Sequence, residues 1–247
     1  MRHIRICVIA GLALAHLPIQ AIADTAPTQA GATPSPLHVL FIGNSYTYVN
    51  KMPSMLSALA ASAISPRRIQ TQMVAEPAAT LQLLWEKGAA EEAIRGRKWD
   101  FVVLQEQSVL PTVEPERMNY YARKFDNVIK KNGARTVLFL TWARRENPEM
   151  QRGLNNAYLN LAKELGAQIA PVGPAWQFAL AAAPSTQLHM EDGSHPTPAG
   201  SYLAACVFFH VLFENQQSCP SIDRSDVSKE DSLIAKKAAS QVVTKIR

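Results

Sequence analysis

A serine that directly follows a short apolar run is the first residue of this sequence that could do chemistry. Residues 37–42 are mostly apolar, and Gly43, Asn44 and Ser45 follow at once. A glycine permits a sharp turn after a buried strand, which would leave the Ser45 hydroxyl exposed and its own N–H free. A nucleophilic serine in acyl transfer needs an exposed Oγ and a backbone donor for the developing oxyanion. A turn serine without a chemical role has the same local pattern.

An aspartate and a histidine three residues apart could supply the base that such a serine needs. Asp192 and His195 stand in an Asp-Gly-Ser-His-Pro segment late in the chain. On a turn, the carboxylate can orient the imidazole and stabilise its cation while the imidazole takes the serine proton. A capping aspartate beside a surface histidine is the other simple interpretation. His189 and Glu191 add a metal site as a third, which the loop disfavours because it lacks helical His spacing; we expect no metal.

The elements that would position these residues alternate along the chain. Apolar runs predict strands at residues 37–42, 100–104, 135–140 and 168–172, and a weak alternation indicates a further strand at residues 69–74. Amphipathic or capped segments predict helices at residues 53–63, 80–94, 114–131, 150–165 and 197–213. Apolar strands separated by helices indicate a parallel sheet covered on both faces, and right-handed crossovers then give a three-layer α/β/α sandwich. We expect one domain over residues 37–247, ending in a polar tail or helix.

In such a sheet, ligands bind at the carboxyl ends of the strands. Ser45 follows the first predicted strand, Gln105 and Gln107 follow the third, and Trp142 and Arg144 follow the fourth. These residues should therefore open on one edge of the sheet. Trp142 could stack on a sugar and Arg144 could hold an acidic group, with Gln105 beside them. A packed tryptophan and a solvated basic loop would account for the same pattern.

Taken together, Gly-Asn-Ser after the first strand and Asp-x-x-His before the last helix resemble the first and last blocks of the SGNH (GDSL-like) hydrolases. The resemblance spans about residues 37–213. It implies a flavodoxin-like sandwich and ester hydrolysis, with Ser45 as nucleophile and Asp192 and His195 completing the triad. Asn44 stands where the family usually has aspartate, which leaves the nucleophile in place.

Two further blocks of the family depart from its usual pattern. The family offers an asparagine side chain to the oxyanion after the third strand, and this sequence has Gln105-Glu106-Gln107-Ser108 there. The resemblance favours Gln107 as the donor. The family's second block supplies a glycine N–H, but residues 77–79 contain no glycine, so the resemblance offers only Ala79. With the N–H of Ser45, these residues make up the expected oxyanion hole.

The ends of the chain carry information on location. In residues 1–23, two arginines precede an apolar run that ends in Ala-Ile-Ala, a pattern typical of a secretory signal peptide. Residues 24–36 are rich in Thr, Ala, Pro and Gly and predict a flexible leader. We expect a periplasmic or secreted protein without stable membrane insertion after signal removal. Cys206 and Cys219 would then remain, and whether they pair is left open.

The formal net charge of +5 is spread along the chain and indicates no nucleic-acid partner. The sequence therefore predicts an exported, cofactor-free serine esterase that removes an acyl group, with acetyl expected, from a carbohydrate or envelope glycan. Two alternatives remain: a lipase- or thioesterase-like hydrolase of longer acyl chains, and a non-catalytic glycan-binding protein on the same fold. The sequence does not identify the natural ester or the oligomeric state.

Overall fold

Five parallel strands form the centre of the protein. The computed structural model describes Met1 and residues 35–64, 67–213 and 218–246, and the residues from 35 onward belong to one compact unit. The strands are β1 (Leu37–Gly43), β2 (Ile69–Ala75), β3 (Phe101–Leu104), β4 (Arg135–Leu140) and β5 (Gln168–Pro171). The expected signal peptide lies outside the described residues except for Met1, as does the leader except for residues 35 and 36.

The helices fill the connections between the strands. They are α1 (Ser45–Tyr48), the 3-10 helix η1 (Val49–Lys51), α2 (Met52–Ala61), α3 (Leu81–Glu86), α4 (Ala89–Arg95), α5 (Leu110–Val113), α6 (Pro115–Asn132), α7 (Met150–Leu165), α8 (Val172–Ala182), α9 (Pro198–Leu212) and α10 (Lys229–Ile246). Among the described helices, none is long and apolar enough to cross a membrane.

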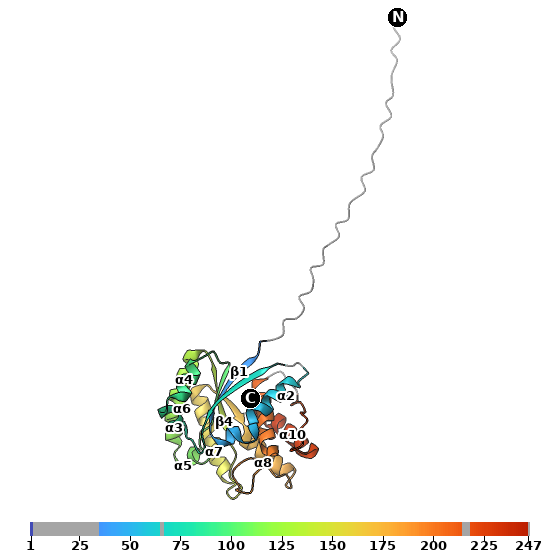
Figure 1. Cartoon of the computed structure of the whole chain (residues 1–247). Helices are drawn as coiled ribbons and strands as arrows, with labels where there is room; N and C mark the ends of the chain where they lie inside the picture. Colours follow the sequence, from blue (N-terminus) through green and yellow to red (C-terminus); the bar gives the residue numbers. More distant parts are fainter. Residues whose placement is uncertain (2–34, 65–66, 214–217, 247) are drawn as a thin grey trace. The chain divides into compact units, whose positions relative to one another are not determined.

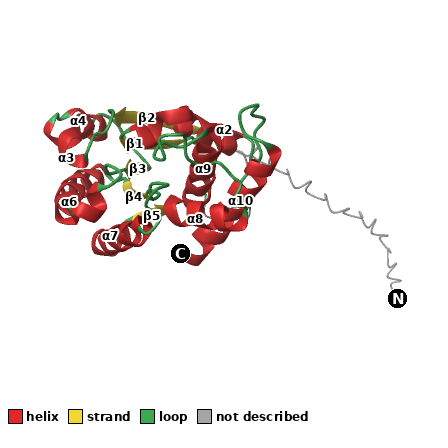
Figure 2. Ribbon diagram, turned by 90° about the horizontal axis from the view of Figure 1, so that it is seen from below, coloured by secondary structure: helices red, strands yellow, loops and turns green. Residues whose placement is uncertain are grey.

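The helices cover the sheet on both faces, as Figure 1 and Figure 2 show. Because side chains alternate along a strand, the strands contribute side chains to two cores, one on each face of the sheet. One core joins the sheet to α2, α8, α9 and α10, and its strand residues include Val39, Phe41, Phe101, Val103, Val137 and Phe139. The other joins the sheet to α3, α4, α6 and α7, and its strand residues include Leu40, Ile42, Val102, Leu104, Leu138 and Leu140. The predicted three-layer sandwich is confirmed.

The strand order places β1 between β2 and β3, where the chain changes its direction across the sheet. The order across the sheet is β2-β1-β3-β4-β5, and Ile42 near the end of β1 pairs with Val74 of β2 and Leu104 of β3. The chain therefore leaves β1 toward one neighbour and later returns on its other side. A reversal of this kind is where open α/β sheets bind their ligands. Ser45 lies two residues past the end of β1.

Two helical segments differ from the prediction, and the structure answers the open question of the cysteines. The helix expected over residues 80–94 is two helices, because Gly88 between them adopts a left-handed backbone (φ 79°). The helix α8 (Val172–Ala182) was not anticipated, since it follows β5 with no polar linker and its apolar residues have no clear helical period. Cys206 and Cys219, left open above, form a disulfide with their Cα atoms 5.6 Å apart.

Candidate active site

Asn44 builds the turn that presents Ser45. Its side-chain oxygen accepts a hydrogen bond from the Tyr46 N–H at 3.1 Å, so it caps α1. Its side-chain amide donates to the Ala79 carbonyl at 3.0 Å, and its own N–H donates to Gln105 Oε1 at 2.9 Å. Ser45 is the first residue of α1, and within the described part of the chain its N–H has no hydrogen-bond acceptor. Three hydrogen bonds of Asn44 thus fix the turn that carries Ser45, the expected nucleophile, and leave the Ser45 N–H free among the described residues.

Gly43 is required for this turn because of how closely Gln105 approaches. A Cβ atom at Gly43 would lie 2.6 Å from Gln105 Oε1 and 2.8 Å from the Thr47 hydroxyl. Such distances are shorter than real Cβ contacts, so any larger residue would displace the amide that holds Asn44. The glycine therefore serves close packing at a φ that other residues could adopt.

The three residues of the expected triad lie together. Ser45 Oγ is 2.9 Å from His195 Nε2, and His195 Nδ1 is hydrogen-bonded to Asp192 Oδ2. The hydrogen bond from His195 lowers the pKa of Asp192 to about 2, and further bonds from the backbone N–H groups of Ser194 and His195 add to this. An ionised carboxylate can only accept hydrogen bonds, so Nδ1 of His195 carries the proton. Nε2 is then free to accept a hydrogen bond from the Ser45 hydroxyl. In this arrangement, His195 Nε2 can take the Ser45 proton, as a general base must.

The loop that carries His195 is fixed to the rest of the site by an aromatic stack. Tyr46 stacks on Trp142 at 4.4 Å between ring centroids, and Trp142 stacks on Trp176 at 4.1 Å. The Trp142 indole N–H donates to the Ser194 carbonyl at 3.0 Å, and the Tyr46 hydroxyl lies 2.7 Å from Ser194 Oγ. Because Ser194 immediately precedes His195, these bonds set where the imidazole stands above Ser45.

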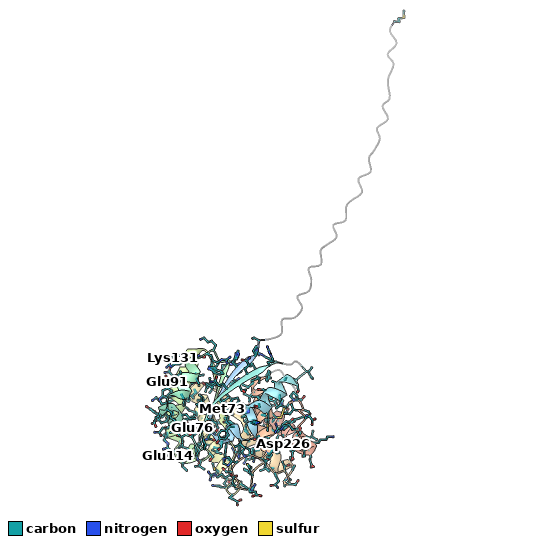
Figure 3. All side chains as sticks on the ribbon, in the orientation of Figure 1. Met73, Glu76, Glu91, Glu114, Lys131 and Asp226 are labelled. Atoms are coloured by element: carbon teal, nitrogen blue, oxygen red, sulfur yellow. A yellow bond between two sulfur atoms is a disulfide. The ribbon has the colours of Figure 1, made fainter. Side chains whose placement is uncertain are left out.

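A cleft of about 260 Å³ opens beside Ser45. It is lined by Asn44, Ser45, Tyr46, Tyr48, Pro77, Ala78, Gln107, Ser108, Arg144, Ser194 and His195. These residues follow β1, β2, β3 and β4 or belong to the histidine loop, as expected for the carboxyl edge of the sheet. Figure 3 labels Met73 in β2 and Glu76 just past its end, where the chain turns into the Pro77–Ala78 wall.

Gln107 faces this cleft with its side chain held at one end. Its side-chain oxygen accepts from the backbone N–H groups of Val109 at 2.8 Å and Leu110 at 3.1 Å. Two donors on one atom identify that atom as the oxygen, which leaves the NH₂ group as the free end. Within the described residues that NH₂ group has no hydrogen-bond partner.

Ala78, which the sequence did not single out, occupies the position expected of a backbone donor. It is exposed, lines the cleft and has a left-handed backbone (φ 54°), a conformation that favours glycine. No acceptor for its N–H is present among the described residues. Ala79 was the wrong choice: it is fully buried, and its N–H already donates to the Glu76 carbonyl at 3.2 Å. Nothing in the sequence signals an alanine with positive φ.

Two residues expected to contact substrate do not reach the cleft. Trp142 is fully buried between Tyr46 and Trp176, so neither of its faces can receive a sugar ring. Gln105 is also fully buried; its side chain accepts from the Asn44 N–H and the Thr47 hydroxyl. Both side chains support the site from beneath rather than bind a ligand.

Arg144 does reach the cleft. Its side chain is exposed, and its only hydrogen bond within the described part of the chain is to Ser108 Oγ at 3.2 Å. No carboxylate among the described residues forms an ion pair with it. The guanidinium group therefore keeps free donors at the mouth of the cleft.

The histidine and acidic residues near the site do not gather into a metal site in the described structure. His189 is buried, its ring bonds to the Ala143 carbonyl at 3.0 Å, and burial lowers its pKa. No group of three or more His, Cys, Asp or Glu side chains that could hold a metal ion is found among the described residues.

Several solved structures are similar to this chain in fold. A protein from Slackia heliotrinireducens, named provisionally as an SGNH hydrolase, is 27% identical over 72% of this chain and 100% of its own, with a TM-score of 0.64. A DUF4886 family protein from Bacteroides uniformis is 19% identical over 85% of this chain and 95% of its own, with a TM-score of 0.74. An acetyl-xylooligosaccharide esterase from Geobacillus, in a mutant form, is 15% identical over 74% of this chain and 97% of its own, with a TM-score of 0.60.

Comparisons of the sequence alone found no match: no protein-family model and no curated protein matches this chain. The structural matches agree with the parallel five-stranded sheet and its flanking helices. The resemblance first read from Ser45, Asp192 and His195 therefore extends to the whole sandwich. In its fold, this chain is similar to the SGNH, or GDSL-like, hydrolases.

Proposed function

We propose that this protein is a serine esterase that hydrolyses carboxylic esters through Ser45, His195 and Asp192. The observation that carries the proposal is the continuous hydrogen-bonded relay from Ser45 Oγ through the imidazole to the Asp192 carboxylate, open to a cleft. A structural histidine would not need a serine hydroxyl at 2.9 Å on one nitrogen and an ionised carboxylate on the other. The arrangement suits proton transfer from a nucleophile.

The reaction proceeds in two acyl transfers. Ser45 Oγ attacks the ester carbonyl as its proton passes to His195 Nε2, and Asp192 stabilises the resulting imidazolium. Collapse of the tetrahedral intermediate breaks the bond to the alcohol, which leaves with the proton from Nε2. Water then attacks the acyl-serine by the same route, releasing the carboxylic acid and restoring Ser45.

Three donors can hold the oxyanion of each intermediate. The Ser45 and Ala78 N–H groups supply two, and the NH₂ group of Gln107 supplies the third. Support comes from their place on one cleft, from the unpartnered state of each donor among the described residues, and from the fixed oxygen end of Gln107. Donors held in place before the reaction contribute most to this kind of catalysis.

We propose an acetyl or similarly short acyl group on a carbohydrate or envelope glycan as the substrate. No Leu, Ile, Val, Met or Phe lines the described cleft: Tyr46, Tyr48, Pro77 and Ala78 supply apolar surface, and hydroxyl, amide and guanidinium groups lie beside them. A long acyl chain needs an apolar groove, and a sugar alcohol needs hydrogen-bonding partners. The acetyl-xylooligosaccharide esterase with the same fold is consistent with this class. The signal peptide expected in residues 1–23 supports export to the periplasm or medium.

The test compares nitrophenyl acetate with nitrophenyl esters of eight and sixteen carbons, followed by a panel of acetylated oligosaccharides. We expect kcat/KM to fall steeply as the acyl chain lengthens, and acetate release from at least one glycan. A preference for the long esters would instead support the lipase-like alternative. A protein that binds acetylated glycans but releases no acetate would support the glycan-binding alternative.

A further inference from the structure

One buried carboxylate beside the active site takes no part in the triad. Glu106 lies two residues past the end of β3, and the residue is 1% exposed. No lysine or arginine among the described residues forms a salt bridge with it. Burying an unpaired carboxylate is costly unless its oxygens accept hydrogen bonds. The hydrogen-bond partners of Glu106 therefore indicate its role in the site.

Those partners are two backbone N–H groups from separate parts of the chain. Glu106 Oε1 accepts from the Gln107 N–H at 2.6 Å and from the Leu81 N–H at 3.2 Å. Its other oxygen lies 3.4 Å from the same Leu81 nitrogen. The Glu106 N–H in turn donates to the Tyr158 hydroxyl at 3.4 Å, which fixes the start of the loop.

The two N–H groups belong to the segments that carry two of the proposed oxyanion donors. Gln107 is one donor itself, and Leu81 begins α3 three residues after Ala78. These segments follow β3 and β2, which are not neighbours, because β1 lies between them and leads into Ser45. The carboxylate of Glu106 thus connects both flanks of the site across the end of β1.

We propose that Glu106 is a positioning residue that sets the distance between the oxyanion donors Ala78 and Gln107. This inference rests on the proposed esterase activity. The bonds that Glu106 accepts fix the backbone of both flanking segments, so the hole is assembled before substrate arrives. A displacement of about 1 Å in such a site can lower the rate a hundredfold.

The test uses substitutions that differ in what they can accept. Glu106→Gln keeps one oxygen for both N–H groups, so kcat on nitrophenyl acetate should stay within about threefold of wild type. Glu106→Met has a similar size and no acceptor comparable to a carboxylate, so kcat should fall about a hundredfold while KM changes little. Affinity for a boronic acid that forms a tetrahedral adduct with the serine should fall in parallel with kcat.

Melting temperatures separate positioning from folding. If Glu106→Met is less stable but its folded fraction keeps the kcat of wild type, Glu106 is only structural and the inference is overturned. Should that variant not fold, Glu106→Asp, which is one methylene too short to reach both N–H groups, decides instead. A lower kcat with wild-type KM supports the inference and an unchanged kcat overturns it. Ester hydrolysis that survives Ser45→Ala would refute the proposed function itself, whatever the Glu106 variants do.

Discussion

At the scale of single residues, Asp192 uses its two carboxylate oxygens for different tasks. Oδ2 accepts from His195 Nδ1, and Oδ1 accepts from the backbone N–H groups of Ser194 and His195 at 2.9 Å each. The first bond holds the imidazole in the tautomer that can act as a base. The second pair shapes the loop. An asparagine at this position could still accept the hydrogen bonds from the loop N–H groups, but it would no longer hold the imidazole in that tautomer.

Asp192→Asn should therefore lower kcat by about 10⁴ with little change in melting temperature, because the wrong histidine tautomer would face Ser45. Steady-state kinetics on nitrophenyl acetate and thermal melts measure the two effects. Glu191→Gln, next to it and also exposed, is the matched control and should leave kcat unchanged. If Asp192→Asn kept more than a tenth of wild-type activity, this carboxylate would not be the one that orients the imidazole.

Gln107 and Gln105 are chemically identical and differ in what their side chains contact. Gln107→Ala should lower kcat about a hundredfold or more with KM nearly unchanged, because its NH₂ group acts mainly in the transition state. Gln107→Glu should be at least as harmful, since it places negative charge next to the oxyanion. Gln105→Ala should show mainly a lower melting temperature, since Gln105 holds Asn44 and Thr47. The opposite pattern in the two alanine variants would transfer the donor role to Gln105.

The stability contributed at Glu106 should depend on pH. Burial raises the pKa of Glu106 to about 7. The hydrogen bonds from the Gln107 and Leu81 N–H groups and the charge of Arg117 lower this pKa, but by less than burial raises it. The folded state binds this proton more tightly than the unfolded state, so the contribution is complete in acid and is lost as pH rises through 7. The loss corresponds to about 3 kcal/mol. The melting temperature of Glu106→Gln relative to wild type should rise between pH 5 and pH 8.5, and a constant difference would contradict the assignment.

At this scale, the motifs Gly-Asn-Ser and Asp-x-x-His pointed to side chains that the structure brings together. Each motif is specific because a serine nucleophile, a histidine base and an aspartate that orients it must be those residue types. It was wrong for Trp142, Gln105 and Ala79, since the end of a strand carries both cleft-facing and buried side chains and one sequence does not separate them. The left-handed backbone of Ala78 depends on how the turn after β2 meets Asn44, which is a tertiary contact.

At the scale of elements, the strands were the best predicted part of the fold. All five were expected within about two residues of their observed ends. A strand buried on both faces, such as β1 or β3, is a continuous apolar run, whereas β2 was expected from a weak alternation. The single helix expected over residues 80–94 was wrong because the amphipathic pattern continues through Gly88 although the backbone does not. The helix α8 was missed because its apolar residues extend around the helix and its start merges with β5.

The disulfide between α9 and the segment before α10 should contribute to stability. Cys206 and Cys219 are both buried and are separated by 13 residues. Closing a loop of this size in the unfolded chain is worth about 3 kcal/mol in the chain-entropy model. Reduction, or the paired change Cys206→Ser and Cys219→Ser, should lower the melting temperature by several degrees while kcat at 25 °C stays the same. Equal melting of oxidised and reduced protein would exclude a stabilising bridge.

At the scale of the whole molecule, the fold unites residues that are 150 positions apart in the chain, Ser45 and His195. The position of β1 between β2 and β3 makes this possible: the loops after β2 and β3 flank its end, and the loop before α9 brings His195 to Ser45. The isolated bridge between His189 and Pro196 and the bond from Asn50 to the Pro196 carbonyl hold that returning loop in place. The nucleophile, the Ala78 and Gln107 donors, and the Asp192–His195 pair therefore come from four segments: those after β1, β2 and β3, and the loop before α9.

The most direct measurement of the central claim is labelling of the purified protein with a fluorophosphonate probe, followed by peptide mass spectrometry and ester kinetics. An activated serine reacts with such a probe and an ordinary turn serine does not. We expect one modified peptide, with the probe on Ser45, complete loss of nitrophenyl acetate hydrolysis on labelling, and no labelling of Ser45→Ala. Ser62→Ala, which changes an exposed serine after α2, should label and turn over as wild type does. Hydrolysis that persists in Ser45→Ala, or a probe found on another residue, would contradict the account.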